Sequence, residues 1–234
     1  MTFIHYQFKK LLRSYSFIPP YCFFILWIVI FYFYKNQIIL SSYASSSIIL
    51  FVITTWLTLN IFKLESSTEK HILFIQLNSK NKFLTYKLIF ALISLAPMML
   101  FSILYPIITG RFSESLNTQT FLLSIYIHLI IVILGIIIGS IVAIQTFLSK
   151  KYSWLFLSLI LVTSMIKFVL IQNYPILKYI LFFIPPIGDF LNLFNQLECK
   201  NWLNKFVSLN LEFAIYIFIS LFIINYIFKK SEYY

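Results

Sequence analysis

"FLLSIYIHLIIVILGIIIGSIVAIQTF", residues 121–147, contains no Asp, Glu, Lys or Arg. A helix of about 20 mostly apolar residues crosses the hydrocarbon core of a bilayer, so this stretch is long and apolar enough to do so. The composition agrees, since 61% of the 234 residues are hydrophobic and 11% are charged, against about 25% charged in soluble domains. The sequence therefore predicts an all-α membrane protein.

Five further stretches have the same apolar character and length, which predicts six transmembrane helices within a single domain, 1–234. The five are 17–34, 43–62, 84–108, 154–172 and 206–228. An even number of spans places both termini on one side of the membrane. The stretch 176–187 is also apolar, but it is too short to cross, and Pro185 and Pro186 break it.

The basic residues indicate which side the termini occupy. Twelve of the eighteen Lys and Arg residues fall on one face, in 1–16, 63–87, 150–151 and 229–230. The positive-inside rule places this face, and both termini, in the cytosol. The net charge of +11 then reflects topology and anionic lipid, and it requires no nucleic-acid partner. The richness in Ile, Phe, Lys and Asn favours a bacterial source, hence the bacterial cytoplasmic membrane.

Residues 1–16 combine apolar and basic side chains in a pattern typical of an amphipathic helix. We expect an N-terminal interfacial helix, with its aromatic and leucine side chains in the headgroup boundary and its basic side chains facing phosphate. A basic tail without helical structure is the alternative.

Signatures of catalysis and of self-powered transport are missing from the sequence. It has four glycines and no GxxxxGK[ST] phosphate loop, and no Cys/His pattern with metal-ligand spacing. No acidic residue lies near the middle of a predicted span, where a proton-coupled carrier usually has one. His128 lies alone in the fourth span, where a packed, hydrogen-bonded role is favoured over a ligand role. We expect no enzyme activity, no metal and no cofactor in this chain.

The second and fifth spans carry mildly polar side chains that have two interpretations. They either form hydrogen bonds between helices, worth about 0.6 kcal/mol each, or line a weakly polar transport pathway. The candidates for such a lining are Thr54, Thr55, Trp56, Thr58, Ser158, Ser164 and Lys167. In the fourth span Gly135, Gly139 and Ala143 recur every four residues, which is typical of a close helix-packing face.

"ESSTEKHILFIQLNSKNKF", residues 65–83, is a polar stretch between two predicted spans. Ser66 and Glu69 have the spacing of a capping box, and Asn78 tolerates the left-handed conformation that ends a helix. The stretch therefore predicts a short cytosolic helix within 65–79. Taken alone, it is either a passive helix on the membrane surface or a docking helix for a partner.

The longer segment "LESSTEKHILFIQLNSKNKFLTYKL", residues 64–88, resembles the segment after the second span in permeases of type-2 ABC exporters. Glu65, Thr68, Ser79, Lys80 and Lys87 fall in matching places around an apolar run. The usual glycine before the threonine is replaced by Ser67, and the usual proline near the turn is replaced by Gln76 or Leu77.

A second resemblance extends the first to the other half of the chain. "YILFFIPPIGDFLNLFNQ", residues 179–196, is similar to the extracellular re-entrant helical hairpin of the same permeases, which lies between the fifth and sixth spans. The resemblance assigns the hairpin to 176–196, and its break to Pro185, Pro186, Gly188 and Asp189.

This family resemblance implies a specific assembly. Two permease subunits, identical or sister chains, pair in the lipid bilayer, and two ABC ATPase subunits bind ATP and Mg beneath them. The helix within 65–79 is then the coupling helix that docks on the ATPase, and the second and fifth spans line the pathway. Its docking residues are expected to be Glu65, Ser66, Thr68, Glu69, Lys70, His71, Ile72, Leu73, Ile75, Leu77 and Lys80.

The chain is most similar in character to permeases of low-GC Gram-positive bacteria that export amphipathic peptides, such as phenol-soluble modulins, or that expel antimicrobial-type peptides for self-immunity. We therefore expect a peptide substrate. Two alternatives stay open: an ATP-independent channel or carrier, and a non-transporting sensor or assembly subunit of a membrane complex.

Overall fold

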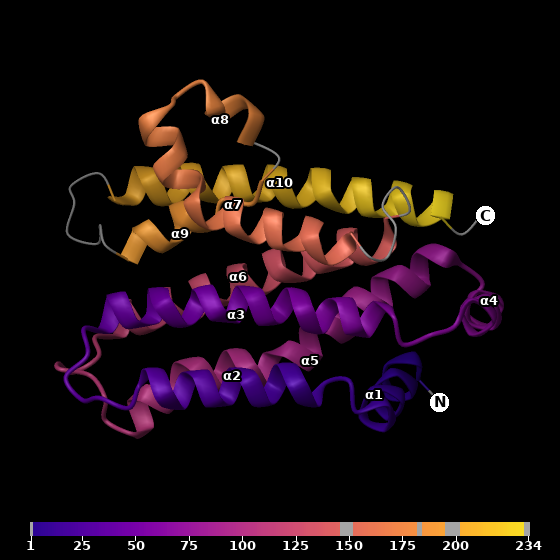
Figure 1. Cartoon of the computed structure of the whole chain (residues 1–234), viewed down its shortest axis with the longest axis horizontal. Helices are drawn as coiled ribbons and strands as arrows, with labels where there is room; N and C mark the ends of the chain where they lie inside the picture. The colour runs from indigo at the N-terminus through magenta and orange to yellow at the C-terminus, as the bar shows by residue number, and fades with distance from the viewer. Residues whose placement is uncertain (1, 146–151, 182–183, 195–201, 232–234) are drawn as a thin grey trace.

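The computed structural model describes residues 2–145, 152–181, 184–194 and 202–231 (Figure 1). The regular secondary structure within them is helical, and an isolated bridge joins Gln37 to Phe112. The helices are α1 Phe3–Ser14, α2 Ile18–Phe31, α3 Ile39–Phe62, α4 Ser67–Gln76, α5 Lys80–Ile108, α6 Thr118–Ile144, α7 Ser153–Asn173, α8 Leu177–Ile180, α9 Ile187–Phe194 and α10 Trp202–Ser231. The predicted all-α class is confirmed.

Five of these helices, α3, α5, α6, α7 and α10, are long and apolar enough to cross a membrane. A sixth span exists only if α1 and α2, which meet at a bend of 79°, are counted together. The predicted span 17–34 is observed as a helix of 14 residues, about 21 Å long, which is shorter than a hydrocarbon core of about 30 Å. The expectation of six complete spans is therefore corrected. The structure has five helices long enough to cross alone, and a sixth span only if α1 and α2 together form a broken one.

The bend before α2 has a local cause. Tyr15 adopts a left-handed conformation, with φ 53°, and ends α1. Two prolines, Pro19 and Pro20, follow within the first turn of α2, where they supply no N–H to continue the preceding helix. The N-terminal segment is thus a helix, as predicted, but it turns sharply into α2.

The other boundaries differ from the predicted spans by a few residues. α5 begins at Lys80, directly after its N-cap Ser79, and runs to Ile108 without interruption. α10 extends from Trp202 to Ser231, beyond the predicted 206–228. Helical backbone hydrogen bonds therefore continue past the apolar residues that marked the spans. Residues 146 and 147 of the predicted fourth span lie outside the described residues.

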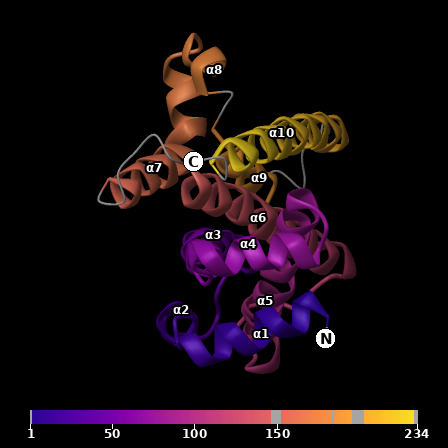
Figure 2. The same ribbon diagram turned by 90° about the vertical axis from the view of Figure 1, so that its right-hand side faces the viewer.

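The helices form a bundle with α3 and α6 at its centre (Figures 1 and 2). α2 and α5 lie on one side of this pair, and α7 and α10 lie on the other. α1 and α4 lie at one end of the bundle, and both ends of the chain lie at that same end (Figure 1). We call it the α4 end.

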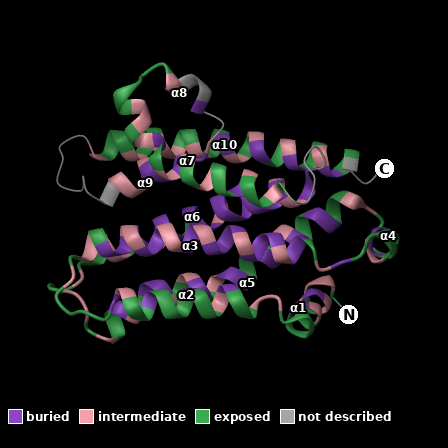
Figure 3. Cartoon of the chain, viewed as in Figure 1, coloured by how far each residue is buried: buried purple, intermediate pink, exposed green. Residues whose placement is uncertain are grey.

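The contact between α3 and α6 is unusually close, because two glycines of α6 face threonines of α3. A Cβ atom at Gly135 would lie 1.9 Å from Thr54 Oγ1, and one at Gly139 would lie 2.7 Å from Thr58 Cβ. The predicted small-residue packing face is confirmed at Gly135 and Gly139. By contrast, α7 and α10 are the least buried of the long helices (Figure 3). In each of them 17% of the most apolar 18-residue stretch is buried inside the chain, against 78% for α6.

Candidate functional site

The polar stretch after α3 forms a capped helix, α4, as the sequence predicts. The backbone N–H of Glu69 donates to Ser66 Oγ at 3.3 Å, and the backbone N–H of Ser66 donates to Glu69 Oε2 at 2.9 Å. This is the predicted capping box. Beyond the other end of the helix, Asn78 has the predicted left-handed conformation, with φ 53°. The residues 65–83 therefore form α4 and the first turn of α5.

Glu69 also ties α4 to α1. Lys10 Nζ lies 2.6 Å from Glu69 Oε2. This hydrogen bond, with the one from the Ser66 backbone, lowers the pKa of Glu69 to about 2. Partial burial alone would lower the pKa of Lys10, but its hydrogen bond to Glu69 and nearby negative charges raise that pKa above its usual value. Both side chains are partly exposed, so the pair contributes at most about 1 kcal/mol and serves chiefly to orient α1.

A second, buried connection lies beneath α4. Gln7 of α1, Glu65 of the α3–α4 connection and Lys87 of α5 have almost no exposed surface. Gln7 Nε2 donates to Glu65 Oε1 at 2.7 Å, Lys87 Nζ donates to Gln7 Oε1 at 3.2 Å, and Lys87 forms an ion pair with Glu65. We call these three residues the buried trio. It joins the start of α4 to α1 and α5. Within it the two charges pair with each other, and the amide forms a hydrogen bond with each of them.

The two faces of α4 differ in character. Its inner face packs through Phe74, whose ring centroid lies 5.0 Å from that of Phe83 and 5.9 Å from that of Phe228. On its outer face Ile72 is 57% exposed and Ile75 is 75% exposed. Two exposed isoleucines on a polar helix contribute little to folding of this chain, so they are available to a partner or to the membrane surface.

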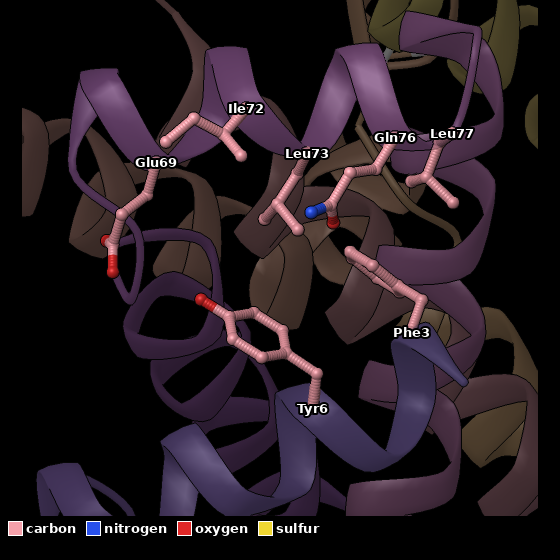
Figure 4. Close-up of a pocket in the computed structure, with 7 residues that line it drawn as sticks. All are labelled: Phe3, Tyr6, Glu69, Ile72, Leu73, Gln76 and Leu77. Atoms are coloured by element: carbon pink, nitrogen blue, oxygen red, sulfur yellow. The ribbon is translucent and has the colours of Figure 1, made fainter. Parts of the chain in front are cut away.

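A groove of about 480 Å³ runs between α1 and α4 (Figure 4). Tyr6 and Phe3 reach from α1 toward Leu73 and Gln76 of α4, and the Glu69 carboxylate lies at one end. The full lining is Phe3, Tyr6, Glu69, Ile72, Leu73, Gln76 and Leu77. A mainly apolar hollow with a few polar groups at its rim is the shape that accepts a projecting apolar side chain.

The structure separates the predicted docking residues into three groups. Ser66, Thr68, His71, Ile72 and Ile75 are exposed; Glu69, Lys70, Leu77 and Lys80 are partly exposed; Glu65 and Leu73 are buried. Glu65 therefore holds α4 in place from beneath, and its carboxylate is not open to a partner in this conformation.

Sequence reasoning did not assign any of the α1 side chains to this site. Phe3 and Tyr6 line the groove, and Gln7 and Lys10 hold α4, across 58 or more residues of chain. One signal was present: Gln7 lies four residues before Leu11 on the buried stripe of α1, and an amide in an apolar stripe needs a hydrogen-bond partner.

The residues considered for a transport pathway are mostly covered in this chain. Thr54, Thr55 and Thr58 have no exposed surface against α6, Ser164 has none in α7, and Lys167 is 7% exposed. The hydroxyls donate to carbonyls of their own helix, as Thr58 Oγ1 does to Thr54 O at 2.7 Å. Trp56 and Ser158 remain accessible. These are contacts of helix packing, and the accessible face of α3 is instead formed by Ser41, Ser45, Ile48, Ile49, Val52 and Trp56.

His128 joins α6 to α3 in the centre of the bundle. Its Nδ1 lies 2.8 Å from Ser124 O, and its Nε2 lies 3.3 Å from the hydroxyls of Ser46 and Ser47. A carbonyl only accepts, so the hydrogen-bond pattern assigns the proton to Nδ1 and leaves Nε2 as an acceptor. This is the packed, hydrogen-bonded role that the sequence favoured.

The segment between α7 and α10 is non-helical at Pro185 and Pro186. Pro185 and Pro186 separate α8 from α9, and Lys167 Nζ of α7 donates to Ile184 O at 2.8 Å. Gly188 packs on α7, where an added Cβ would lie 3.1 Å from Phe168 Cβ. Asp189 lies in the first turn of α9 and is half-buried. Residues 182, 183, 195 and 196 of the predicted hairpin are outside the described residues.

Within the part of the chain that the structure describes, no group of three or more His, Cys, Asp or Glu side chains is placed to hold a metal ion. In comparisons with known proteins, no family model, no curated protein and no solved structure matches this chain. Fold and site together define a helical chain with the character of a multi-pass membrane protein and a braced, accessible helix at one end.

Proposed function

We propose that this chain is the permease subunit of an ATP-driven ABC exporter and that α4 is its docking helix for a separate ATPase subunit. One observation carries the proposal. α4 is held from within by the buried trio and the Lys10–Glu69 pair, while Ile72 and Ile75 stay exposed beside a groove. A helix that transmits force from a partner to the spans needs firm attachment on one face and an open surface on the other.

The proposed orientation places the α4 end in the cytosol and the chain in the bacterial cytoplasmic membrane. The concentration of basic residues at that end supports it. α1 would lie at the membrane surface, where its exposed Leu12 and Tyr15 enter the headgroup boundary. The α8–α9 segment would then be the extracellular re-entrant hairpin. Non-helical backbone at membrane depth must be covered by protein, and the contact between Lys167 and Ile184 supports this placement.

The proposed complex contains two permease subunits and two ATPase subunits, and the ATPases bind ATP and Mg. Binding of ATP by a separate subunit is consistent with the lack of a phosphate loop in this sequence. Pairing of permeases is supported by the large exposed apolar surfaces of α2 and α7, which flank the accessible face of α3. Two copies would enclose that face. Its mixture of hydroxyls with Val52 and Trp56 suits an amphipathic peptide better than a strongly hydrated substrate.

The test is isolation of the complex from its native membrane, identification of its subunits by mass, and ATP-dependent peptide transport in reconstituted vesicles. Ile75→Arg is expected to weaken ATPase binding about 30-fold, as loss of an interface hot spot does. Ile38→Arg, at an exposed isoleucine beyond the other end of the bundle, is the matched control and should leave binding unchanged. If no ATPase is recovered and vesicles show no ATP-dependent transport, the chain is a channel, a carrier or a non-transporting subunit.

A further inference from the structure

A second groove lies on the side of the bundle between α5, α6 and α10. It has a volume of about 190 Å³, and every lining side chain is Leu or Ile, among them Ile89 and Leu92 of α5, Ile136 of α6 and Leu221 of α10. Ile89 and Leu92 are about two-fifths exposed. The groove therefore opens sideways out of the bundle, at a depth where the helices themselves are apolar.

Positive charge lies beyond this groove, where α5 and α10 meet at the α4 end. Phe83 of α5 and Phe228 of α10 stack with ring centroids 6.0 Å apart and an interplanar angle of 6°, which brings the start of α5 and the end of α10 together at the α4 end. Each ring is adjacent in sequence to an exposed lysine, Lys82 and Lys229.

Helical geometry aligns the charge on α5 with the groove. Lys82, Tyr86 and Ile89 follow one another at i, i+4 and i+7, so they share a face of α5. Lys82 lies about 10 Å along the axis from Ile89. Tyr86, which is partly exposed, lies between them, at the level where interfacial tyrosines are common in membrane helices. The surface thus changes from cationic, through amphipathic, to wholly aliphatic.

We propose that this groove binds an anionic phospholipid from the leaflet at the α4 end. One acyl chain lies in the groove, and the phosphate lies between Lys82 and Lys229. A diacyl phospholipid combines in one molecule an apolar chain and an anionic head, which is the order of chemistry that the surface presents. The proposal requires only that the helices lie in a membrane, so it stands independently of the proposed transport function.

The lipid would add packing contacts where the bundle has few of its own. α10 makes few contacts with α5, and the groove is the space left between them over α6. An ordered acyl chain would fill this space and hold α10 against the rest of the bundle.

The experiment reconstitutes the full chain in vesicles of phosphatidylcholine and phosphatidylglycerol, extracts it in mild detergent and counts retained lipids by native mass spectrometry. The native chain is expected to retain phosphatidylglycerol in preference to phosphatidylcholine. Each lysine removed in Lys82→Gln/Lys229→Gln should reduce that retention about fivefold. Lys35→Gln/Lys178→Gln removes the same charge from exposed positions away from the α4 end and should leave retention nearly unchanged.

A second variant tests the acyl chain separately. Leu92→Phe fills the groove while both lysines remain, and it should also displace the lipid, with circular dichroism verifying that helix content is kept. The proposal is overturned if the two double variants retain equal amounts of phosphatidylglycerol, if the native chain does not discriminate between the lipids, or if Leu92→Phe retains as much lipid as the native chain.

Discussion

The ammonium group of Lys87 lies out of water, opposite the carboxylate of Glu65, and the Gln7 amide bonds to both. Desolvation of such a pair offsets most of its mutual attraction, so the intact pair contributes little net stability compared with well-packed apolar residues. Removing one partner has a different result, because the other charge then remains buried and uncompensated. The buried trio therefore matters more for where α4 is held than for how much energy it adds.

We expect Lys87→Met to lower the free energy of unfolding by about 3–5 kcal/mol, since it leaves the Glu65 carboxylate buried and unpaired. The double variant Glu65→Leu/Lys87→Met should recover most of this loss. Thermal unfolding followed by fluorescence-detected size-exclusion chromatography measures both. Lys10→Met, in the exposed pair with Glu69, is the control and should cost under about 1 kcal/mol. A double variant that is less stable than Lys87→Met would contradict this account.

At the scale of elements, the link between α1 and α4 has a predictable pH dependence. The pKa of Glu69 falls from 4.5 to about 2 in the folded chain. The ionised Glu69 carboxylate therefore stabilises the contact between α1 and α4 fully above pH 4.5, and this stabilisation is lost as the pH falls from 4.5 toward 2. Spin labels at His5→Cys and His71→Cys, in a background without native cysteines, should report a constant distance between α1 and α4 from about pH 8 to about pH 5 and a broader one near pH 2.

Glu69→Gln supplies the control for this titration, because it removes the ionisable group while keeping the side-chain shape. In that variant the distance distribution should already be broad at neutral pH and should not change on acidification. A native chain that broadens above pH 5 would show that another group controls the link.

One side chain of α7, Lys167, forms a hydrogen bond with the backbone of the α8–α9 segment. In Lys167→Met the partly buried carbonyl of Ile184 loses its hydrogen bond from Lys167 Nζ. Leaving such an acceptor unsatisfied costs about 1 kcal/mol, the lower end of the range for buried groups. We expect the segment to open more often, which thiol labelling of Ile187→Cys, a buried position, measures as a faster rate. Lys178→Met, at an exposed lysine of α8, should not change the rate.

Features that depend on residues close together in the sequence could be predicted, and contacts between distant residues could not. The capping box of α4 and the left-handed Asn78 depend on residues within four positions of each other, and both were predicted. The short α2 was missed because Tyr32, Phe33 and Tyr34 continue the apolar pattern although the helix ends at Phe31. The buried trio joins residues 22 to 80 positions apart, and no local pattern encodes such a contact. The sequence also indicated Thr54 and Thr58 as candidates for a pathway lining, but it could not show that Gly135 and Gly139 cover them.

At the scale of the whole molecule, the bundle is divided into a tight centre and a loose side. α3 and α6 approach so closely that a methyl group at Gly135 would overlap Thr54, whereas α7 and α10 are mostly exposed outside the bundle. A change in shape that accompanies any transport cycle would therefore occur more readily by movement of α7 and α10 than by separation of α3 from α6.

Amide hydrogen exchange in a membrane mimetic tests this division. Since opening free energy follows local packing, the middle of α3 and α6 should exchange slowest, and α7 and α10 should exchange faster at equal depth. Comparison at equal depth controls for protection by the detergent or lipid. Equal protection in all the long helices would contradict the division.

The buried trio also bears on how the chain is made. Gln7 and Glu65 both precede Lys87, so the amide and the carboxylate that satisfy this lysine have already left the ribosome when it emerges. A lysine close to the membrane-facing part of α5 would otherwise be costly to insert. The order of residues along the chain thus lets α5 enter the bilayer beside its partners, without waiting for α6 or α10 to be synthesised.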